Sequence, residues 1–279
     1  MGVADPVDLR SWRAELALRY ELRDGRTVLT QRRHEGPLVV QKPLYPEGDA
    51  VCHTIVVHPP GGIAGGDELH VHAHAGPSAH VLLTTPAAGK WYRSTGPWAQ
   101  QRVVLKVESA ARVEWLPQET ILFDRARADI ETHVDLAPDA IFIGWDTLCL
   151  GRAGSGERYM DGECRLHTRV TRAGKLLWFE RALIAAGGLF CNSPIGLDGR
   201  TVCGTLLAVG PNVGGIMSAC RAERAAVGAT GVTQVPGLLV ARYLGDSSEA
   251  ARTYFQRLWK HIRPALTGRA AHEPRIWKT

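Results

Sequence analysis

The sequence predicts a mainly β protein, a single large domain spanning residues 1–279, whose antiparallel strands form a solenoid- or sandwich-like stack with two helices near the C-terminus. Short segments of alternating apolar and polar residues indicate the strands, and turn-forming residues separate them at short intervals. An amphipathic helical stripe occurs only late in the chain. The 279 residues, 45% of them apolar, can bury a large core, and no linker or low-complexity stretch divides them.

The segment 14–22 is the clearest strand candidate. Leu16 and Tyr20 fall on one face, whereas Arg19 falls on the other, which is the period-two pattern of a half-buried strand. The dipeptide Asp24-Gly25 follows it and indicates a hairpin. The other strand candidates are residues 53–58, 80–85, 102–108, 112–116, 140–146, 175–186 and 237–244. The turns between them are expected at residues 76–77, 109–110, 173–174 and 236–237.

Two helices are expected, over residues 215–226 and 247–263. In the second, Asp246 is the expected N-cap, Glu249 completes a capping box, and Pro264 lies just past the end. The apolar residues that share one face of this helix are Ala251, Tyr254, Phe255, Leu258, Trp259 and Ile262.

Composition excludes several classes of partner. The formal charge is +5, but acids are interspersed among the arginines and no basic block contains aromatic residues, so no nucleic-acid partner is expected. No apolar run is long enough to span a membrane, and the N-terminal residues do not resemble a secretory signal, so we expect a cytoplasmic protein without a membrane partner. The six cysteines form no C-x-x-C pair, which argues for reduced thiols and against structural zinc.

The stretch HPPGGIAGGDELH, residues 58–70, is rich in glycine and proline. A phosphate-binding loop would need a lysine after the last glycine, but Gly66 is followed by Asp67 and Glu68, which would repel phosphate. We therefore interpret the stretch as a tight turn that positions Asp67 near a passage or an interface.

Histidines follow this loop directly. His70, His72 and His74 share one face of an expected strand, where imidazoles two residues apart could share nickel, zinc or copper weakly. The alternative is that they face water while the alternate apolar residues face the core. His53 and His58, beside the loop, are somewhat better ligand candidates, and the sequence leaves both interpretations open.

Three further stretches, LLTTPAAGKWYRS, EWLPQETILFDRA and WDTLCLGRAGSGERYMDGE, place polar residues at expected strand ends and turns. Their carboxylates could serve as general acids and bases or hold a cation. The alternative is surface charge paired with arginine, as Arg152 could pair with Glu157. The candidate residues in these stretches are Thr84, Thr85, Lys90, Arg93, Glu119, Asp146, Arg152, Glu157 and Glu163.

These three stretches, together with HPPGGIAGGD and the terminal EPRIWKT, occur in an order that resembles the UreD family of urease accessory proteins, called UreH in some organisms. The resemblance covers nearly the whole chain. Trp91 and Tyr159 stand where the family often has phenylalanine, and both changes are conservative.

The resemblance implies a scaffold in nickel insertion rather than an enzyme. Members of the family bind apo-urease and UreF, which recruits the GTPase UreG as the source of nickel. They are expected to form a dimer of UreD–UreF pairs and to hold no tight cofactor, nickel being transient. The implied fold is mainly β and solenoid-like with late helices. The resemblance also implies an internal passage for nickel, lined in part by polar and acidic residues of these motifs. Asp67 and the candidate residues of the three stretches are therefore expected to act in nickel transit or at interfaces.

Three alternatives stay open at the level of sequence. A hydrolase could use Asp67, Glu119 or Asp146 as paired carboxylates. A metal-storage protein could use the face formed by His70, His72 and His74. A passive interface protein would use its acids only for salt bridges to its partners.

Overall fold

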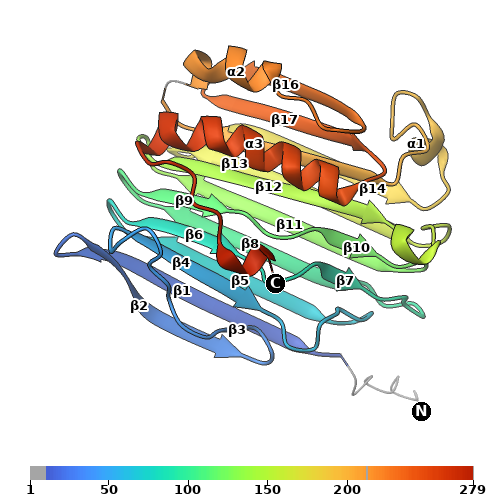
Figure 1. The fold of residues 1–279 in the computed structure, drawn as a ribbon. Coiled ribbons are helices and arrows are strands. Elements are labelled where there is room, and N and C mark those ends of the chain that lie inside the picture. Colours follow the sequence, from blue (N-terminus) through green and yellow to red (C-terminus); the bar gives the residue numbers. More distant parts are fainter. Residues whose placement is uncertain (1–10, 212, 279) are drawn as a thin grey trace.

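The computed structural model describes residues 11–211 and 213–278, and these residues form two large β-sheets that face each other (Figure 1). The seven-stranded sheet contains, in spatial order, β14 (Lys175–Ala185), β13 (Glu163–Arg172), β11 (Arg127–Leu136), β8 (Ala99–Val107), β5 (Glu68–Ala75), β1 (Arg13–Arg23) and β2 (Arg26–Glu35). The ten-stranded sheet contains β16 (Ala229–Val235), β17 (Leu238–Gly245), β15 (Val202–Val209), β12 (Ile141–Leu150), β9 (Arg112–Trp115), β6 (His80–Thr84), β4 (Val51–Val57) and β3 (Val39–Val40). In addition, β10 (Thr120–Leu122) pairs with β12, and β7 (Gly89–Trp91) pairs with β10. The mainly β, solenoid-like prediction is confirmed.

The prediction of antiparallel strands is wrong for the middle of the molecule. Between β4 and β13 the chain passes repeatedly from one sheet to the other, so that β1, β5, β8, β11 and β13 are parallel neighbours, as are β4, β6, β9 and β12. Antiparallel pairing is confined to both ends of the stack, where β1–β2 and β13–β14 are hairpins. The turns at residues 76–77 and 109–110 connect one sheet to the other and do not form hairpins. The sequence could not show this, because the alternation of residues within a strand carries no information about the direction of the neighbouring strand.

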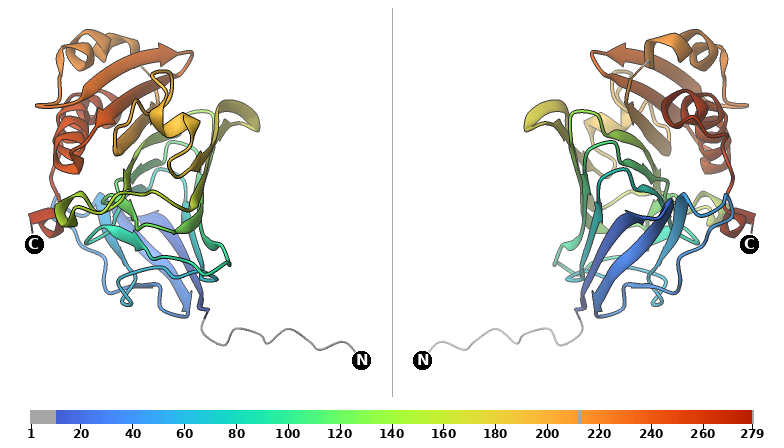
Figure 2. Two further views of the ribbon diagram at one scale, coloured as in Figure 1. Left: turned by 90° about the vertical axis from the view of Figure 1, so that its right-hand side faces the viewer. Right: turned by 90° about the vertical axis from the view of Figure 1, so that its left-hand side faces the viewer.

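A hydrophobic core fills the space between the sheets, and a second core lies on the outer side of the ten-stranded sheet. The second core is covered by helix α3 (Ser248–Thr267), which Figure 2 shows lying against that outer side. The central strand β12 is therefore buried on both faces, and its run Ile141, Phe142, Ile143 is continuously apolar.

Helix α3 confirms the predicted apolar stripe, whose residues are all buried, but corrects both predicted ends. Ser247 is the N-cap and accepts a hydrogen bond from the Ala250 N–H, whereas Asp246 binds Arg200 and Thr201 instead. Pro264 lies inside the helix, which continues to Thr267 because packing of the apolar stripe continues for another turn.

The predicted helix over residues 215–226 is shorter than expected. A 3₁₀ turn, η2 (Val213–Ile216), precedes α2 (Met217–Ala222), and the backbone becomes extended at Glu223. Glycines in the first turn disfavour a regular helix there. The sequence did not predict α1 (Leu189–Asn192) or the 3₁₀ turns η1 (Ala153–Ser155) and η3 (Arg275–Lys278).

Among the helices of the described residues, none combines the length and the apolar character needed to cross a membrane.

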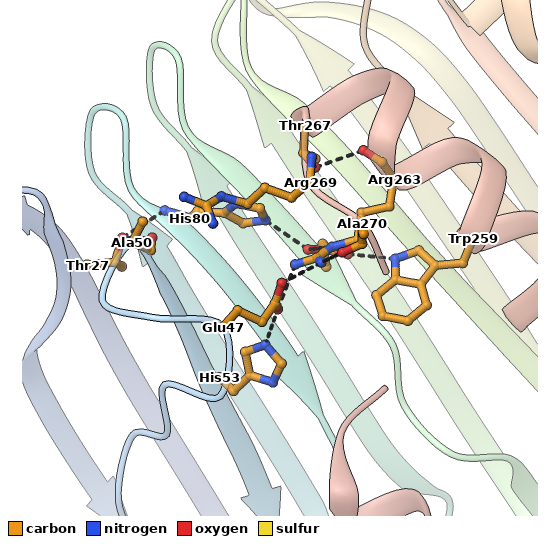
Figure 3. A network of polar contacts seen from close by, with 11 residues as sticks. Thr27, Glu47, Ala50, His53, His80, Trp259, Arg263, Thr267, Arg269 and Ala270 are labelled. Atoms are coloured by element: carbon orange, nitrogen blue, oxygen red, sulfur yellow. Dashed lines mark hydrogen bonds and ion pairs between the residues drawn. The ribbon is translucent and has the colours of Figure 1, made fainter. Parts of the chain in front are cut away.

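A buried polar network attaches α3 to the ten-stranded sheet (Figure 3). The guanidinium of Arg263, fully buried, donates from Nε to Glu114 on β9 at 2.9 Å and from Nη1 and Nη2 to Glu47 at 2.6 and 2.8 Å. His53 on β4 lies 2.6 Å from Glu47, and His80 on β6 lies 2.8 Å from Glu114. The network thus joins one turn of the helix to three neighbouring strands and to the loop before β4.

Replacing Arg263 with alanine should destabilise the protein by about 3–5 kcal/mol, because two buried carboxylates lose their main cation. The measurement is urea unfolding at pH 7. Arg257→Ala, on an exposed position of the same helix, is the matched control and should change stability by less than about 0.5 kcal/mol. Equal effects of the two substitutions would contradict the role assigned to the network.

Acid should weaken this network. Burial alone would raise the pKa of Glu47, but hydrogen bonds from His53 and Arg263 outweigh it and lower the pKa to about 2. Because the folded pKa lies below the unfolded value of about 4.3, this contribution to stability is present at neutral pH and is lost as the pH falls from about 4.3 toward 2. Urea midpoints measured across this range should fall more steeply for the wild type than for Glu47→Gln, and identical slopes would contradict the assignment.

Candidate functional site

Two adjoining cavities lie between the sheets. The first, of about 450 Å³, is bordered by β13, β14, β15, β17 and the α1 segment, and we call it the α1-side cavity. The second, of about 230 Å³, is bordered by β5, β7, β8 and the glycine loop before β5, and we call it the β7-side cavity. Five residues line both: Thr120, Ile130, Thr132, Asp146 and Thr147. The cavities therefore meet at the middle of β12.

Asp146 is the carboxylate at this junction. On the inward face of β12 it lies between Gly144 and Leu148, where the strand's alternation would otherwise place an apolar residue. Its side chain lines both cavities, so its accessible surface faces the space between the two sheets. Burial, with a smaller effect of Glu180, raises the pKa of Asp146 to about 7. Near neutral pH the group can therefore exchange a proton for a cation.

A charged pair lies beside Asp146 in the α1-side cavity, with Arg242 in the same row of the ten-stranded sheet and Glu180 on the other sheet. Arg242 on β17 donates to Glu180 on β14 at 2.7 Å and to the hydroxyl of Thr205 on β15 at 2.6 Å. The attraction of Arg242 lowers the pKa of Asp146, but burial outweighs it. The pairing with Glu180 leaves Arg242 only partly available to balance the charge of Asp146.

The β7-side cavity is lined by a different set of polar groups. Thr85, Lys90 and Gln101 border it, and so does His58 at the start of the glycine loop. The Nε2 atom of His58 is buried and has no hydrogen-bond partner among residues 11–211 and 213–278. Burial lowers the pKa of His58, so the neutral imidazole, which can accept a cation, is favoured.

Apolar side chains gather where the α1-side cavity borders the surface. Phe190, Ile195 and Leu197 of the α1 segment line this cavity, and Ile195 is 97% exposed. Leu189 is 92% exposed beside them. The edge strand β14, which contacts the α1 segment, carries three further exposed apolar side chains on its outer face: Leu176, Phe179 and Leu183. We refer to Leu176, Phe179, Leu183, Leu189, Phe190 and Ile195 as the α1–β14 patch.

The chemistry of the two cavities is that of weak oxygen donors. Carboxylates and threonine hydroxyls can contact a divalent cation, but in the described part of the chain the only group of three metal-binding side chains close enough to share an ion lies elsewhere, at Glu131, His133 and His167. The cavities thus offer successive partial contacts instead of a closed ligand set.

The structure places Asp67 and Thr84 outside the lining of both cavities. Asp67 is buried, and its carboxylate accepts hydrogen bonds from the N–H groups of Trp12 and Ala64, both at 2.8 Å. Thr84 donates to the Leu116 carbonyl. The glycine loop is a tight turn, as interpreted from the sequence, and its aspartate holds the turn to the chain before β1.

Three other predicted carboxylates lie outside the two cavities. Arg152 and Glu157 form an ion pair beside a surface groove of about 500 Å³ that Arg93 also lines. Glu163 pairs with Arg127 at 2.9 Å. Glu119 lies in a small crevice next to α3.

Of the predicted histidines, only His58 reaches a cavity. His53 belongs to the buried network around Arg263. His70, His72 and His74 lie on the outer face of β5, as the alternation indicated, and His74 contacts Glu108 at 3.0 Å.

Sequence reasoning missed Glu180, Arg242 and Thr132 of the cavities. Each lies on the inward face of a strand, and an inward polar residue among apolar neighbours is the available signal. That signal becomes readable only when the strand's inward face is known.

The chain is similar to known proteins over nearly its whole length. The family model described as UreD urease accessory protein matches residues 13–278. The chain is 52% identical to the urease accessory protein UreD of Dechloromonas aromatica (strain RCB), covering 100% of this chain and 99% of that protein, and 51% identical to that of Azoarcus sp. (strain BH72), covering 96% and 94%. The chain therefore belongs to the UreD family of urease accessory proteins.

Proposed function

We propose that this protein is a non-catalytic scaffold that binds apo-urease and UreF, and through UreF the GTPase UreG, and that nickel passes through its two adjoining cavities on the way to urease. The observation that carries the proposal is the position of Asp146, a carboxylate with a pKa of about 7 where the two cavities meet. Nickel is the cargo in this scheme, and the protein holds no cofactor of its own.

Weak coordination suits transit. A closed set of histidine or cysteine ligands would retain nickel, whereas single carboxylates and hydroxyls along a cavity allow the ion to exchange from one position to the next. Thr120, Thr132 and Thr147 flank Asp146 and supply such hydroxyls. His58 supplies one nitrogen donor at the β7 side.

The α1–β14 patch supports the scaffold role. Large exposed apolar side chains that lie together on a surface mark protein interfaces, and two members of this patch, Phe190 and Ile195, line the α1-side cavity. A partner docked there would cover the entrance to the cavity, so nickel could enter without crossing bulk water. Two such scaffold–UreF pairs would form the assembled dimer.

Asp146→Asn should reduce nickel incorporation into urease severalfold while leaving complex formation unchanged, because the substitution removes the charge and keeps the shape. Nickel content of urease is measured after activation with UreF, UreG and GTP at pH 6, 7 and 8. Incorporation by the wild type should rise across this range as Asp146 loses its proton, and the variant should show a flatter profile.

Asp24→Asn, at the exposed tip of the β1–β2 hairpin, is the matched control for the loss of one carboxylate. Normal incorporation by Asp146→Asn would contradict nickel passage through the cavities. Failure of that variant to assemble, with the fold retained, would instead favour a passive interface role for the acid.

Replacing Leu189 and Ile195 together with serine should reduce co-purification of UreF or of apo-urease, because the patch loses its two most exposed apolar side chains. Both partners are tested separately with tagged full-length protein. Leu22→Ser, at an exposed position on β1, is the control. Undiminished capture of both partners by the double variant would exclude the patch as an interface.

A further inference from the structure

The outer face of the seven-stranded sheet carries a cluster of metal-binding side chains that the proposed function does not use. Glu131 and His133 lie on β11, and His167 lies on the neighbouring parallel strand β13, directly opposite Glu131 in the register. One donor atom from each of the three residues lies within 4.8 Å of the other two. We propose that these residues form a binding site for a borderline divalent cation such as Zn²⁺ or Ni²⁺ on this outer face. Of the three, only His167 also borders the α1-side cavity.

The distances fit such an ion with little adjustment. Tetrahedral coordination with bonds of about 2.1 Å places neighbouring donors about 3.4 Å apart. The Nε2 atom of His133 lies 3.6 Å from the Glu131 carboxylate, too far for a hydrogen bond but close to the spacing of two ligands on one ion. Since the third donor lies within 4.8 Å of both, a side-chain rotation that moves it by about 1–1.5 Å completes the set.

The two imidazoles also lack other partners. Their Nε2 atoms are buried, and neither has a hydrogen-bond partner in the part of the chain that the structure describes. A buried donor or acceptor without a partner costs about 1–3 kcal/mol, and a bound cation would satisfy both nitrogens at once. The rings contact each other edge to face at 5.1 Å, and Phe179 packs against His167 at 5.0 Å, which limits the approach of water.

The ligand types select the ion. Two imidazole nitrogens and one carboxylate oxygen suit zinc, nickel or copper, whereas magnesium and calcium prefer oxygen alone. Three protein ligands leave a fourth position open to water, which makes the bound ion exchangeable. Access is available from a depression of about 100 Å³ that Glu131 lines together with His70 and Asp129.

One neighbour competes for the carboxylate. The Nε atom of Arg102 on β8 lies 2.9 Å from Glu131, and the Arg102 side chain is 48% exposed and can turn toward solvent. Removing the Arg102 guanidinium should therefore strengthen metal binding, whereas removing a ligand should weaken or abolish it. Opposite effects of substitutions at adjacent positions are not expected from a general loss of stability.

The test is equilibrium dialysis of the full-length protein with Zn²⁺ alone and with Ni²⁺ alone. The His133→Gln/His167→Gln variant should lose one bound ion per chain, Glu131→Gln should weaken binding by about tenfold or more, and Arg102→Gln should tighten it. Bound Co²⁺ should give the intense visible absorption of a four-coordinate site in the wild type and lose it in the double variant.

The matched control is His70→Gln/His72→Gln, which removes two histidines from the same face of the sheet, whose rings lie 6.4 Å apart. This control should keep the bound ion. Equal stoichiometry in the wild type and in the His133→Gln/His167→Gln variant, or loss of the ion in the control alone, would overturn the proposal. Circular dichroism checks that each variant is folded, and because the ion is measured on the isolated protein, neither result depends on nickel passage between the sheets.

Discussion

The attachment of α3 by Arg263 is the interaction on which the remaining structure depends. Its guanidinium meets Glu114 and Glu47, which come from segments far apart in the sequence, and the histidines beside them extend the contact to β4 and β6. A buried ion pair contributes little net stability compared with well-packed apolar residues, so its value here lies in geometry. In the observed placement of the helix both buried carboxylates are paired, and the helix covers the outer face of the ten-stranded sheet.

The covered sheet in turn determines the chemistry of Asp146. With α3 on its outer side and the seven-stranded sheet on its inner side, β12 is removed from bulk water on both faces. A carboxylate there loses hydration that the nearby Arg242 does not fully replace, because that arginine is held by Glu180. The pKa near 7 follows from this arrangement and not from a single neighbour.

Local patterns predicted the elements well, since alternation and the apolar stripe depend on near neighbours in the chain. The strand over residues 14–22, its hairpin and the helix that contains Trp259 and Ile262 are where the sequence placed them. Helix ends were less accurate because Ser247 and Asp246 are both competent caps, and the choice depends on Arg200, a tertiary contact. Only part of the candidate site could be predicted from the sequence. Asp146 and His58 were recognised by residue type, whereas Glu180 and Arg242 become neighbours of Asp146 only through the fold.

The parallel stacking of strands explains why the structure repeats although the sequence shows no repeat. It also explains why residues far apart in the sequence become neighbours in space. Each coil contributes one strand to each sheet, but the loops between strands differ in length, so equivalent residues recur at unequal intervals and no sequence period emerges. In space the register is strict, and His70, Arg102, Glu131 and His167 occupy one row across four neighbouring strands. Such a row places side chains from different coils within reach of one another on the outer face, as it does on the inner face around Asp146. The same stacking therefore creates polar sites on the outer face of the seven-stranded sheet and on the inner face of the ten-stranded sheet. The sign and spacing of the side chains in each row decide whether they pair with each other or leave donors available for a cation.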